Sequence, residues 1–467
     1  MLFNSLHYLF FFLPIVVFLY FIFLKINSSF GKIFLILASL YFYGSYNFYY
    51  LLLIIFSVIA NFCLANILSK YPNKNFLILG ILINIFLLSF FKYSDFVIEN
   101  FNELLTSEIE YLNFPFPLAI SFFTFQQIGF LFDIYDKNLK KISFKDYFLF
   151  ICFFPQLVAG PIVRVNFFLN QFLNKNIYKL NFKNLNIGII LISIGLFKKI
   201  VVSDSLANIA NLGFSNPENL TSLETLICSY AFTIQFYFDF SAYVDIALGS
   251  ALLLNIKLPL NFNSPFRATS IINFWERWHI TLTNFLTNFI YMPLARSFKE
   301  VTFLKSMFSI LVVFIIAGIW HGPSWMFVIF GMMHGIGLII NHSFRKLFKI
   351  KLNIFVSWFI TFNYINISFI FFRSSNLDVA LLFLKNIFLN PFLIKFTGFT
   401  SENILNLGTL NSLLLVCSFI FSIFFKNSNF FLKNFKPNFF NMFLTLTFLF
   451  LPILIINKAN EFIYFNF

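Results

Sequence analysis

The sequence has few charged residues for its length, and this scarcity excludes most soluble protein classes. Asp, Glu, Lys and Arg make up 11% of the 467 residues, whereas hydrophobic residues make up 60%. Soluble domains carry about 25% charged residues. Many of the apolar runs approach the roughly 20 residues that a helix needs to cross a bilayer. The composition therefore predicts an all-α integral membrane protein.

Cysteine is also scarce, and its distribution excludes two kinds of stabilising site. The four cysteines stand singly within apolar runs, at Cys63, Cys152, Cys228 and Cys417. Disulfide frameworks and metal sites need other spacings. We interpret these cysteines as small core residues and expect no metal ion.

The sequence also lacks a linker and an internal repeat. Without a linker, residues 1–467 are expected to form one polytopic domain. The missing repeat argues against a transporter built from inverted repeats. The first apolar run, 9–24, has no basic segment before it and no clear small-residue cleavage site. We therefore expect it to be kept as the first membrane helix.

The charges that are present are unbalanced, with 32 basic and 18 acidic residues and a net charge of +14. In a membrane protein this excess is typical of cytoplasmic loops that meet anionic lipid, so it does not predict nucleic-acid binding. Basic loops alternate with acidic or uncharged loops over five successive connections. The alternation predicts an outer N-terminus, an outer loop at 95–110 and a cytoplasmic loop at 137–145.

The apolar runs predict about eleven spans, counting as one the hairpin around His321. Residues 147–158 are too short to span easily and lie between basic residues, which predicts a re-entrant segment. The Trp- and Arg-containing stretch 255–300 predicts an interfacial helix on the cytoplasmic side. A short helix is expected at 378–389. The other spans are expected at 8–24, 31–45, 47–69, 75–92, 115–133, 185–202, 226–254, 352–372, 410–425 and 439–456.

One histidine, His321, stands between two long apolar runs, 303–316 and 324–340. The neighbouring Gly318 and Pro323 allow one helix to end and another to begin. An ionisable side chain at membrane depth is destabilising unless it faces protein, water or a substrate path. The pattern predicts a functional histidine at a helix break. The alternative is a core histidine bonded to a backbone carbonyl.

Other polar side chains also fall at membrane depth. Asp239 and Asp245 lie within the span 226–254, where we favour hydrogen bonds to neighbouring helices over a proton relay. Arg164 follows the Gly-Pro break and either neutralises a phosphate or extends to the interface. Trp275 and His279 are four positions apart and are expected to share one face of a helix.

Several ordered motifs give the sequence a family resemblance. The motifs are Phe153-Phe-Pro-Gln-Leu-Val-Ala-Gly-Pro-Ile-Val-Arg164, Gln235-Phe-Tyr-Phe-Asp-Phe-Ser-Ala-Tyr-Val-Asp245, Asn261-Phe-Asn-Ser-Pro-Phe266, Phe274-Trp-Glu-Arg-Trp-His-Ile-Thr-Leu282 and Gly318-Ile-Trp-His-Gly322. With these motifs in this order, the sequence resembles the bacterial branch of the membrane-bound O-acyltransferase family, which includes alginate and peptidoglycan O-acetyltransferases and the teichoic-acid D-alanyl transfer protein. The resemblance covers about residues 8–342, whereas 350–467 match in hydrophobic pattern alone.

The resemblance implies a funnel-shaped fold with His321 as a catalytic residue. It implies His279 as a second catalytic histidine, with substrate binding as the alternative role. A base of this kind removes the proton of an attacking hydroxyl and contributes roughly 10²–10⁴-fold to the rate. The other histidines, His7, His334 and His342, are expected to be structural or interfacial. Substrate contacts are expected from Trp320, Arg164, Asp239, Trp275, Arg277 and Trp278.

The last residues carry a second resemblance. Phe462-Ile-Tyr-Phe465 is similar to the C-terminal Phe-x-Tyr-Phe of a small partner peptide used in teichoic-acid D-alanylation, whose tyrosine is implicated as an acyl carrier. This implies that Tyr464 receives the acyl group through His321. A phenol has a pKa of about 10 and a thiol of about 8.5, so an aryl ester keeps much of the reactivity of a thioester. The alternative is an interfacial tyrosine that anchors the last helix.

These inferences combine into one predicted function. An acetyl group moves from acetyl-CoA in the cytoplasm across the bacterial inner membrane to an envelope polysaccharide, with a periplasmic serine esterase-like partner. Peptidoglycan is favoured over an alginate-like exopolysaccharide, and D-alanylation comes third. A transporter or flippase would instead predict paired charges along a path and a fold repeat, and the sequence shows neither. The remaining alternative is a non-catalytic scaffold of an envelope complex.

Overall fold

The fold is helical throughout the part of the chain that the structure describes. A computed structural model describes residues 1–139, 142–348, 350, 352–389, 408–455 and 460–463. Within these ranges, eight helical runs are long and apolar enough to cross a membrane, and three shorter apolar helices accompany them. The predicted all-α integral membrane fold is confirmed.

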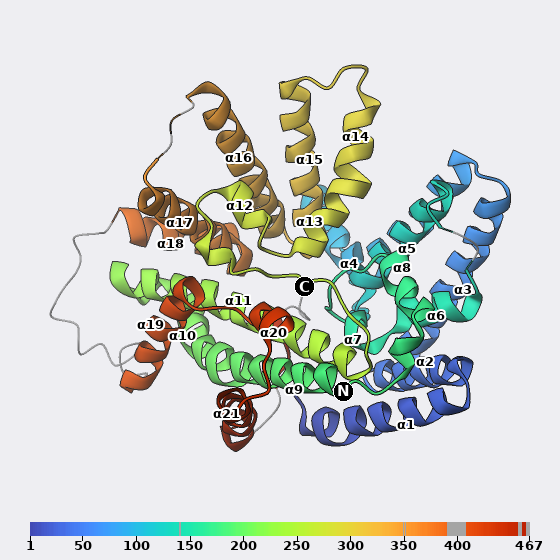
Figure 1. The fold of residues 1–467 in the computed structure, drawn as a ribbon. Helices are drawn as coiled ribbons and strands as arrows, with labels where there is room; N and C mark the ends of the chain where they lie inside the picture. The colour runs from blue at the N-terminus through green and yellow to red at the C-terminus, as the bar shows by residue number, and fades with distance from the viewer. Residues whose placement is uncertain (140–141, 349, 351, 390–407, 456–459, 464–467) are drawn as a thin grey trace.

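Two long antiparallel segments form the centre of the molecule (Figure 1). α9 (Phe182–Leu196) continues through the π-helix η4 (Phe197–Ser203) into α10 (Asp204–Ser215), and this run packs along α11 (Ser222–Leu253). The span predicted at 185–202 does not end at 202, because the helical run continues to Ser215. Asp204 was expected in an outer loop, but it lies in this run and pairs with Lys199 at 2.9 Å.

The N-terminal helices pack beside this centre. They are η1 (Tyr8–Phe12), α1 (Leu13–Ile26), α2 (Ser28–Gly44), α3 (Phe48–Lys70), α4 (Lys74–Leu105) and α5 (Ile120–Tyr135). α4 continues well past its predicted end at 92. α5 starts later than predicted and is buried along nearly its whole length, so this span faces protein on all sides.

The predicted re-entrant segment forms two short helices inside the protein. α6 (Phe144–Cys152) and α7 (Phe154–Leu157) meet at Phe153, and every residue from 147 to 163 is buried. Irregular backbone at membrane depth is tolerated where protein surrounds it. Three short helices follow: α8 (Val165–Leu169), η2 (Asn170–Leu173) and η3 (Lys175–Tyr178).

The Trp-rich stretch departs from its prediction. It consists of η6 (Pro265–Arg267), α12 (Ile271–Trp275), α13 (Ile280–Leu286), η7 (Thr287–Tyr291) and α14 (Met292–Ser297). The prediction that Trp275 and His279 share one face of a helix is wrong, because α12 ends at Trp275 and His279 has a left-handed φ of 43°. The interfacial placement of Trp275 and Trp278 is also wrong. Both are 4% exposed because the protein supplies their aromatic partners.

The hairpin around His321 forms as predicted, from α15 (Phe303–His321) and α16 (Trp325–Leu347) (Figure 1). Gly318 and Gly331 let the two backbones touch, because a Cβ on Gly331 would collide with the carbonyl oxygen of Phe314. The remaining helices are α17 (Ile354–Arg373), α18 (Leu377–Phe388), α19 (Gly408–Phe424), α20 (Asn429–Asn434) and α21 (Phe439–Ile455). α18 confirms the predicted short helix.

Candidate active site

His321 lies on the wall of a cavity of about 610 Å³. It is the last residue of α15 and is 6% exposed. The wall also includes Trp320, Lys92 of α4 and Ser121 of α5. The helix break predicted at His321 therefore lies beside a cavity, with the imidazole on its wall.

Lys92 fixes the end of the helix that carries His321. Its Nζ donates to the carbonyl oxygens of Trp320 at 2.6 Å and of His321 at 3.0 Å. A cation at a helix C-terminus satisfies the last carbonyls and opposes the negative end of the helix dipole. Sequence reasoning missed this residue. The signal was a single lysine at the end of a long apolar run, which the prediction treated as the end of a span.

Aromatic rings surround the imidazole of His321. Its ring centroid lies 5.0 Å from that of Trp320, 5.3 Å from that of Phe372 and 5.6 Å from that of Phe330. The rings limit the directions from which a substrate can approach.

His279 also lies near Trp320, at 6.2 Å between ring centroids. Its Nδ1 is 3.1 Å from the Oδ1 of Asn261, which also accepts from the backbone N–H and the hydroxyl of Thr281. Because the N–H of Thr281 can only donate, the atom facing it is the amide oxygen, and His279 Nδ1 must carry the proton. The Nε2 of His279 therefore bears the lone pair.

A second cavity, of about 260 Å³, lies behind the same aromatic layer. Phe125 lines it and stacks on Trp320 at 5.2 Å, while Trp320 lines the first cavity. Phe125 and Trp320 thus separate the two spaces. The polar lining of the second cavity consists of Gln126, Asp133, Arg164, Thr281, Asn284 and Asn288.

The predicted substrate-binding residues fall into two groups. Trp320 and Arg164 line the cavities, and the exposed guanidinium of Arg164 lies 5.0 Å from the ring of Phe289. The other residues bind the surrounding protein. Trp275 Nε1–H donates to His334 Nδ1, Trp278 stacks on Phe274, and Arg277 donates to the Asn273 side chain and the Asn263 carbonyl.

His334 is completely buried, as expected for a structural histidine. Its Nδ1 accepts from Trp275 at 3.2 Å, and its Nε2 lies 3.0 Å from the hydroxyl of Ser368. Both ring nitrogens are therefore engaged by neighbouring helices. His334 ties α12 and α17 to the helix that follows His321.

The carboxylates of α11 are held by lysines that sequence reasoning missed. Asp239 pairs with Lys199 at 2.8 Å, and Asp245 pairs with Lys198 at 2.6 Å. Hydrogen bonding to a neighbouring helix, predicted for both carboxylates, is confirmed. Paired charges, which a transporter would predict along its path and which were not apparent in the sequence, are thus present between η4 and α11. The signal was Lys198-Lys199 at the end of a predicted span.

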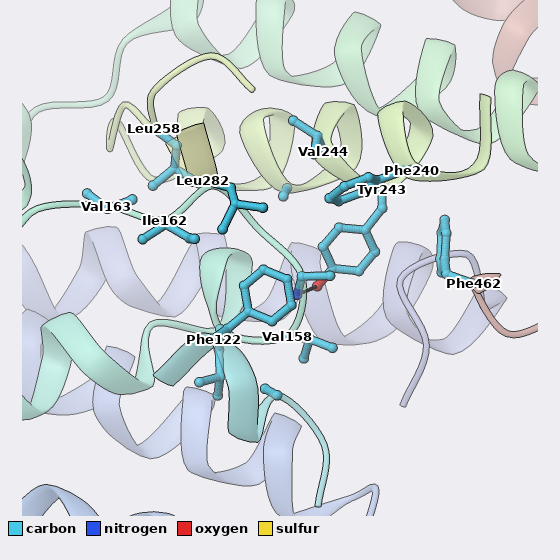
Figure 2. Packing of buried hydrophobic residues seen from close by; sticks show 14 of the residues in the cluster. Phe122, Val158, Ile162, Val163, Phe240, Tyr243, Val244, Leu258, Leu282 and Phe462 are labelled. Carbon is cyan, nitrogen blue, oxygen red and sulfur yellow. Dashed lines mark hydrogen bonds between the residues drawn. The ribbon is translucent and has the colours of Figure 1, made fainter. Parts of the chain in front are cut away.

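Tyr464 lies outside the described residues, but the segment directly before it, 460–463, is described. Glu461 lines the cavity of His321. The N–H of Ile463 donates to Asp239 Oδ2 at 2.8 Å, and Phe462 is completely buried beside Tyr243 (Figure 2). The C-terminal segment therefore enters the protein interior beside the candidate active site.

Comparisons with known proteins agree with this geometry. A model of the membrane-bound O-acyltransferase (MBOAT) family matches residues 133–384. The chain is 42% identical over 421 residues to the peptidoglycan O-acetyltransferase of Helicobacter pylori. This alignment covers 82% of this chain and 79% of the relative. It is 30% identical over 391 residues to the probable alginate O-acetylase AlgI of Pseudomonas aeruginosa, covering 81% and 73%. It is 27% identical over 245 residues to the teichoic acid D-alanyltransferase of Streptococcus thermophilus, covering 50% and 58%.

The relatives act on envelope polymers of bacteria, and the family uses acyl donors. Within the described residues, no group of three or more His, Cys, Asp or Glu side chains is placed to hold a metal ion. The acyl-transfer chemistry expected from the motifs, and a multi-pass location in the bacterial inner membrane, are confirmed. The chain belongs to the membrane-bound O-acyltransferase family and is an acyltransferase.

Proposed function

We propose that this protein moves an acetyl group from cytoplasmic acetyl-CoA across the inner membrane for the O-acetylation of peptidoglycan. One observation carries the proposal: the His321 imidazole lies on a cavity wall, with Trp320 and Phe125 between it and a second cavity. The relative with 42% identity carries peptidoglycan O-acetyltransferase in its name, which favours peptidoglycan as the acceptor. Alginate-like exopolysaccharide is the second candidate, and teichoic-acid D-alanylation is the third.

His321 acts as the general base in this proposal. A hydroxyl oxygen forms a bond to the acyl carbonyl carbon while His321 takes its proton, and the thiolate of the donor leaves. His321 then returns the proton to the thiolate, so that atoms and charges balance. The direct bonds from Lys92 to the backbone of Trp320 and His321 support a fixed position for the base. A positioned base of this kind contributes roughly 10²–10⁴-fold.

His279 is proposed as the second catalytic group, on the donor side of Trp320. The Asn261 amide fixes its tautomer, which directs the lone pair of Nε2 away from Asn261. The alternative is that His279 orients the donor. Its neighbour Thr281 lines the second cavity, and this proximity supports contact with whatever occupies that space.

The second cavity is proposed to receive the donor. Arg164 is exposed at this cavity, and a guanidinium forms bidentate bonds with phosphate oxygens. Trp320 would then contact the acyl group between the two cavities. For Trp275, Arg277 and Trp278, the bonds to surrounding protein favour a supporting role over the substrate contact expected from the sequence.

Tyr464 is proposed to carry the acyl group between donor and polysaccharide. It directly follows Ile463, whose N–H is bound by Asp239, and Glu461 lines the cavity of His321. Tyr464 is three positions after Glu461 in the sequence, and this closeness along the chain supports the proposal. A periplasmic serine esterase-like partner would then move the group from the aryl ester to the polysaccharide hydroxyl.

The test replaces His321→Ala and Tyr464→Phe in a strain without the chromosomal gene. Ester-linked acetate is released from purified peptidoglycan by base and measured, with protein levels checked in the membrane fraction. In both variants, the amount of ester-linked acetate should be at least 100-fold lower than in the wild type. His7→Ala and Tyr49→Phe, which change an exposed histidine and an exposed tyrosine, should keep it.

The possible outcomes separate the proposed roles. Unchanged acetylation in Tyr464→Phe would remove the carrier role, and unchanged acetylation in His321→Ala would favour a scaffold or transporter. Acetate found on an exopolysaccharide, but not on peptidoglycan, would move the acceptor to the second candidate.

A further inference from the structure

Three buried polar side chains bind the backbone of the C-terminal segment. Lys199 Nζ donates to the carbonyl oxygen of Glu461 at 2.8 Å, and the N–H of Ile463 donates to Asp239 Oδ2 at 2.8 Å. Asn4 Nδ2 donates to the carbonyl oxygen of Asn460 at 2.9 Å. All three side chains belong to residues that are at most 1% exposed, and they come from three distant parts of the chain.

The ionic cluster is complete only when the C-terminal segment is bound to it. Lys199 directs its three protons at Asp239, Asp204 and the carbonyl oxygen of Glu461. Asp239 Oδ1 accepts from Lys199 and from the Ser203 hydroxyl, while Oδ2 accepts from Ile463 N–H. Two carboxylates face one ammonium, so the cluster has an excess of acceptors. A buried carboxylate oxygen needs a donor, and the peptide N–H supplies one.

One side chain of the segment is recognised as well as its backbone. The ring of Phe462 is completely buried beside that of Tyr243 (Figure 2), in an edge-on contact at 5.1 Å between centroids. Lys199 Nζ lies 4.8 Å from the centroid of the Phe462 ring. The hydroxyl of Tyr243 accepts from the N–H of Ala159, next to the Gly-Pro break. Phe462 thus fixes the register of the segment against the innermost part of the protein. Glu461 beside it is exposed and faces the cavity of His321.

We infer that Asn4, Lys199 and Asp239, together with the pocket around Phe462, form a binding site for a peptide whose occupant is the chain's own C-terminal segment, 460–463. Backbone bonds provide affinity, and the buried Phe462 provides specificity and register. Asp239 is then a positioning residue that holds the peptide, and not the substrate contact that the sequence predicted. The purpose of this site rests on the proposed carrier role of Tyr464, whereas peptide binding itself does not.

Hydrogen–deuterium exchange of the full-length protein in lipid nanodiscs tests the inference. The measured signal is deuterium uptake at the amide of Ile463, resolved from overlapping peptic fragments of the C-terminus. In the wild type this amide should exchange at least tenfold more slowly than in the same sequence as a free peptide. Lys199→Met and Phe462→Ala should each raise its exchange rate at least tenfold.

Lys198→Met is the matched control. Lys198 is the neighbouring buried lysine, and it pairs with Asp245 without contacting the segment 460–463. Its substitution should leave the exchange rate of the Ile463 amide within threefold of wild type. If Lys199→Met also speeds exchange within α11, Phe462→Ala decides, because this change leaves the ionic side chains in place.

Two results would overturn the site: an Ile463 amide that exchanges in the wild type as in a free peptide, or unchanged exchange in Phe462→Ala. The exchange readout does not depend on activity. Protection of the Ile463 amide together with a silent His321→Ala variant would therefore keep the peptide site and reject the proposed function.

Discussion

At the scale of single residues, Lys92 links the stability of a helix end to the position of the proposed base. Its ammonium binds two carbonyl oxygens, those of Trp320 and His321, and it is 6% exposed. A lysine on the surface would instead remain hydrated and would not bind the backbone of another helix. The contact with two consecutive carbonyls makes Lys92 a positioning residue for His321.

Replacing Lys92→Met should leave both carbonyl oxygens without this donor. Each buried acceptor that loses its partner costs about 1–3 kcal/mol. We expect at least a tenfold loss of O-acetylation and a lower melting temperature for the purified protein. The measurements are ester-linked acetate on peptidoglycan and thermal unfolding in detergent.

Lys74→Met provides the control, because Lys74 is an exposed lysine at the start of the same helix, α4. It should retain wild-type acetylation and stability. Wild-type behaviour of Lys92→Met in both assays would show that His321 keeps its position without the ammonium.

The sequence predicted His321 but not Lys92, and the reason is physical. His321 stands out locally, because a lone imidazole between two apolar runs is destabilising without a partner. Lys92 lies at the predicted end of a span, where a lysine ordinarily reaches the interface. Its carbonyl partner on Trp320 is 228 positions away. Pairings over such a distance depend on tertiary packing, which local patterns do not contain.

At the scale of elements, the hairpin of α15 and α16 determines where His321 lies. Gly318 faces Gly331 across the helix pair, and a Cβ on either residue would meet a backbone carbonyl of the other helix. Backbone atoms cannot move aside as the end of a flexible side chain can. Any side chain at these positions must therefore push the two helices apart.

Gly331→Ala should destabilise the protein and impair acyl transfer together. Overpacking of a tight contact costs about 1–3 kcal/mol, and here it also displaces the end of α15. Thermal unfolding and the acetylation assay measure the two effects. Gly44→Ala is the control, because its new Cβ would meet the flexible end of Leu51 at 3.2 Å. Equal stability of the two variants would contradict the close helix contact.

Helices were predictable where periodicity and length agreed, and less so where tertiary contacts interrupt them. The hairpin around His321 follows from two apolar runs and a Gly-Pro interruption. The break between Trp275 and His279 does not, because their spacing of four suits a helix. Asn261 instead binds both His279, which has a left-handed φ, and Thr281, and these bonds join parts of the chain that are 18 and 20 positions apart.

At the scale of the whole molecule, two cavities lie on either side of the Phe125–Trp320 pair. The loops that line the cavity of His321 are those that the charge pattern places outside, and they include Tyr46 and Glu461. The second cavity is lined by residues from segments expected on the cytoplasmic side, such as Asn288. Such an arrangement suits a group that is received on one face and delivered on the other.

Cysteine labelling tests the orientation of the two cavities. In a background with the exposed Cys63 and Cys417 replaced by serine, Tyr46→Cys should react with a membrane-impermeant maleimide in spheroplasts. Asn288→Cys, at the rim of the second cavity, should react only after the inner membrane is permeabilised. The serine background without added cysteine gives the baseline. Reaction of both variants in sealed spheroplasts would place both cavities on the outer face, and delivery of a cytoplasmic acetyl group through Trp320 would then have no entry side.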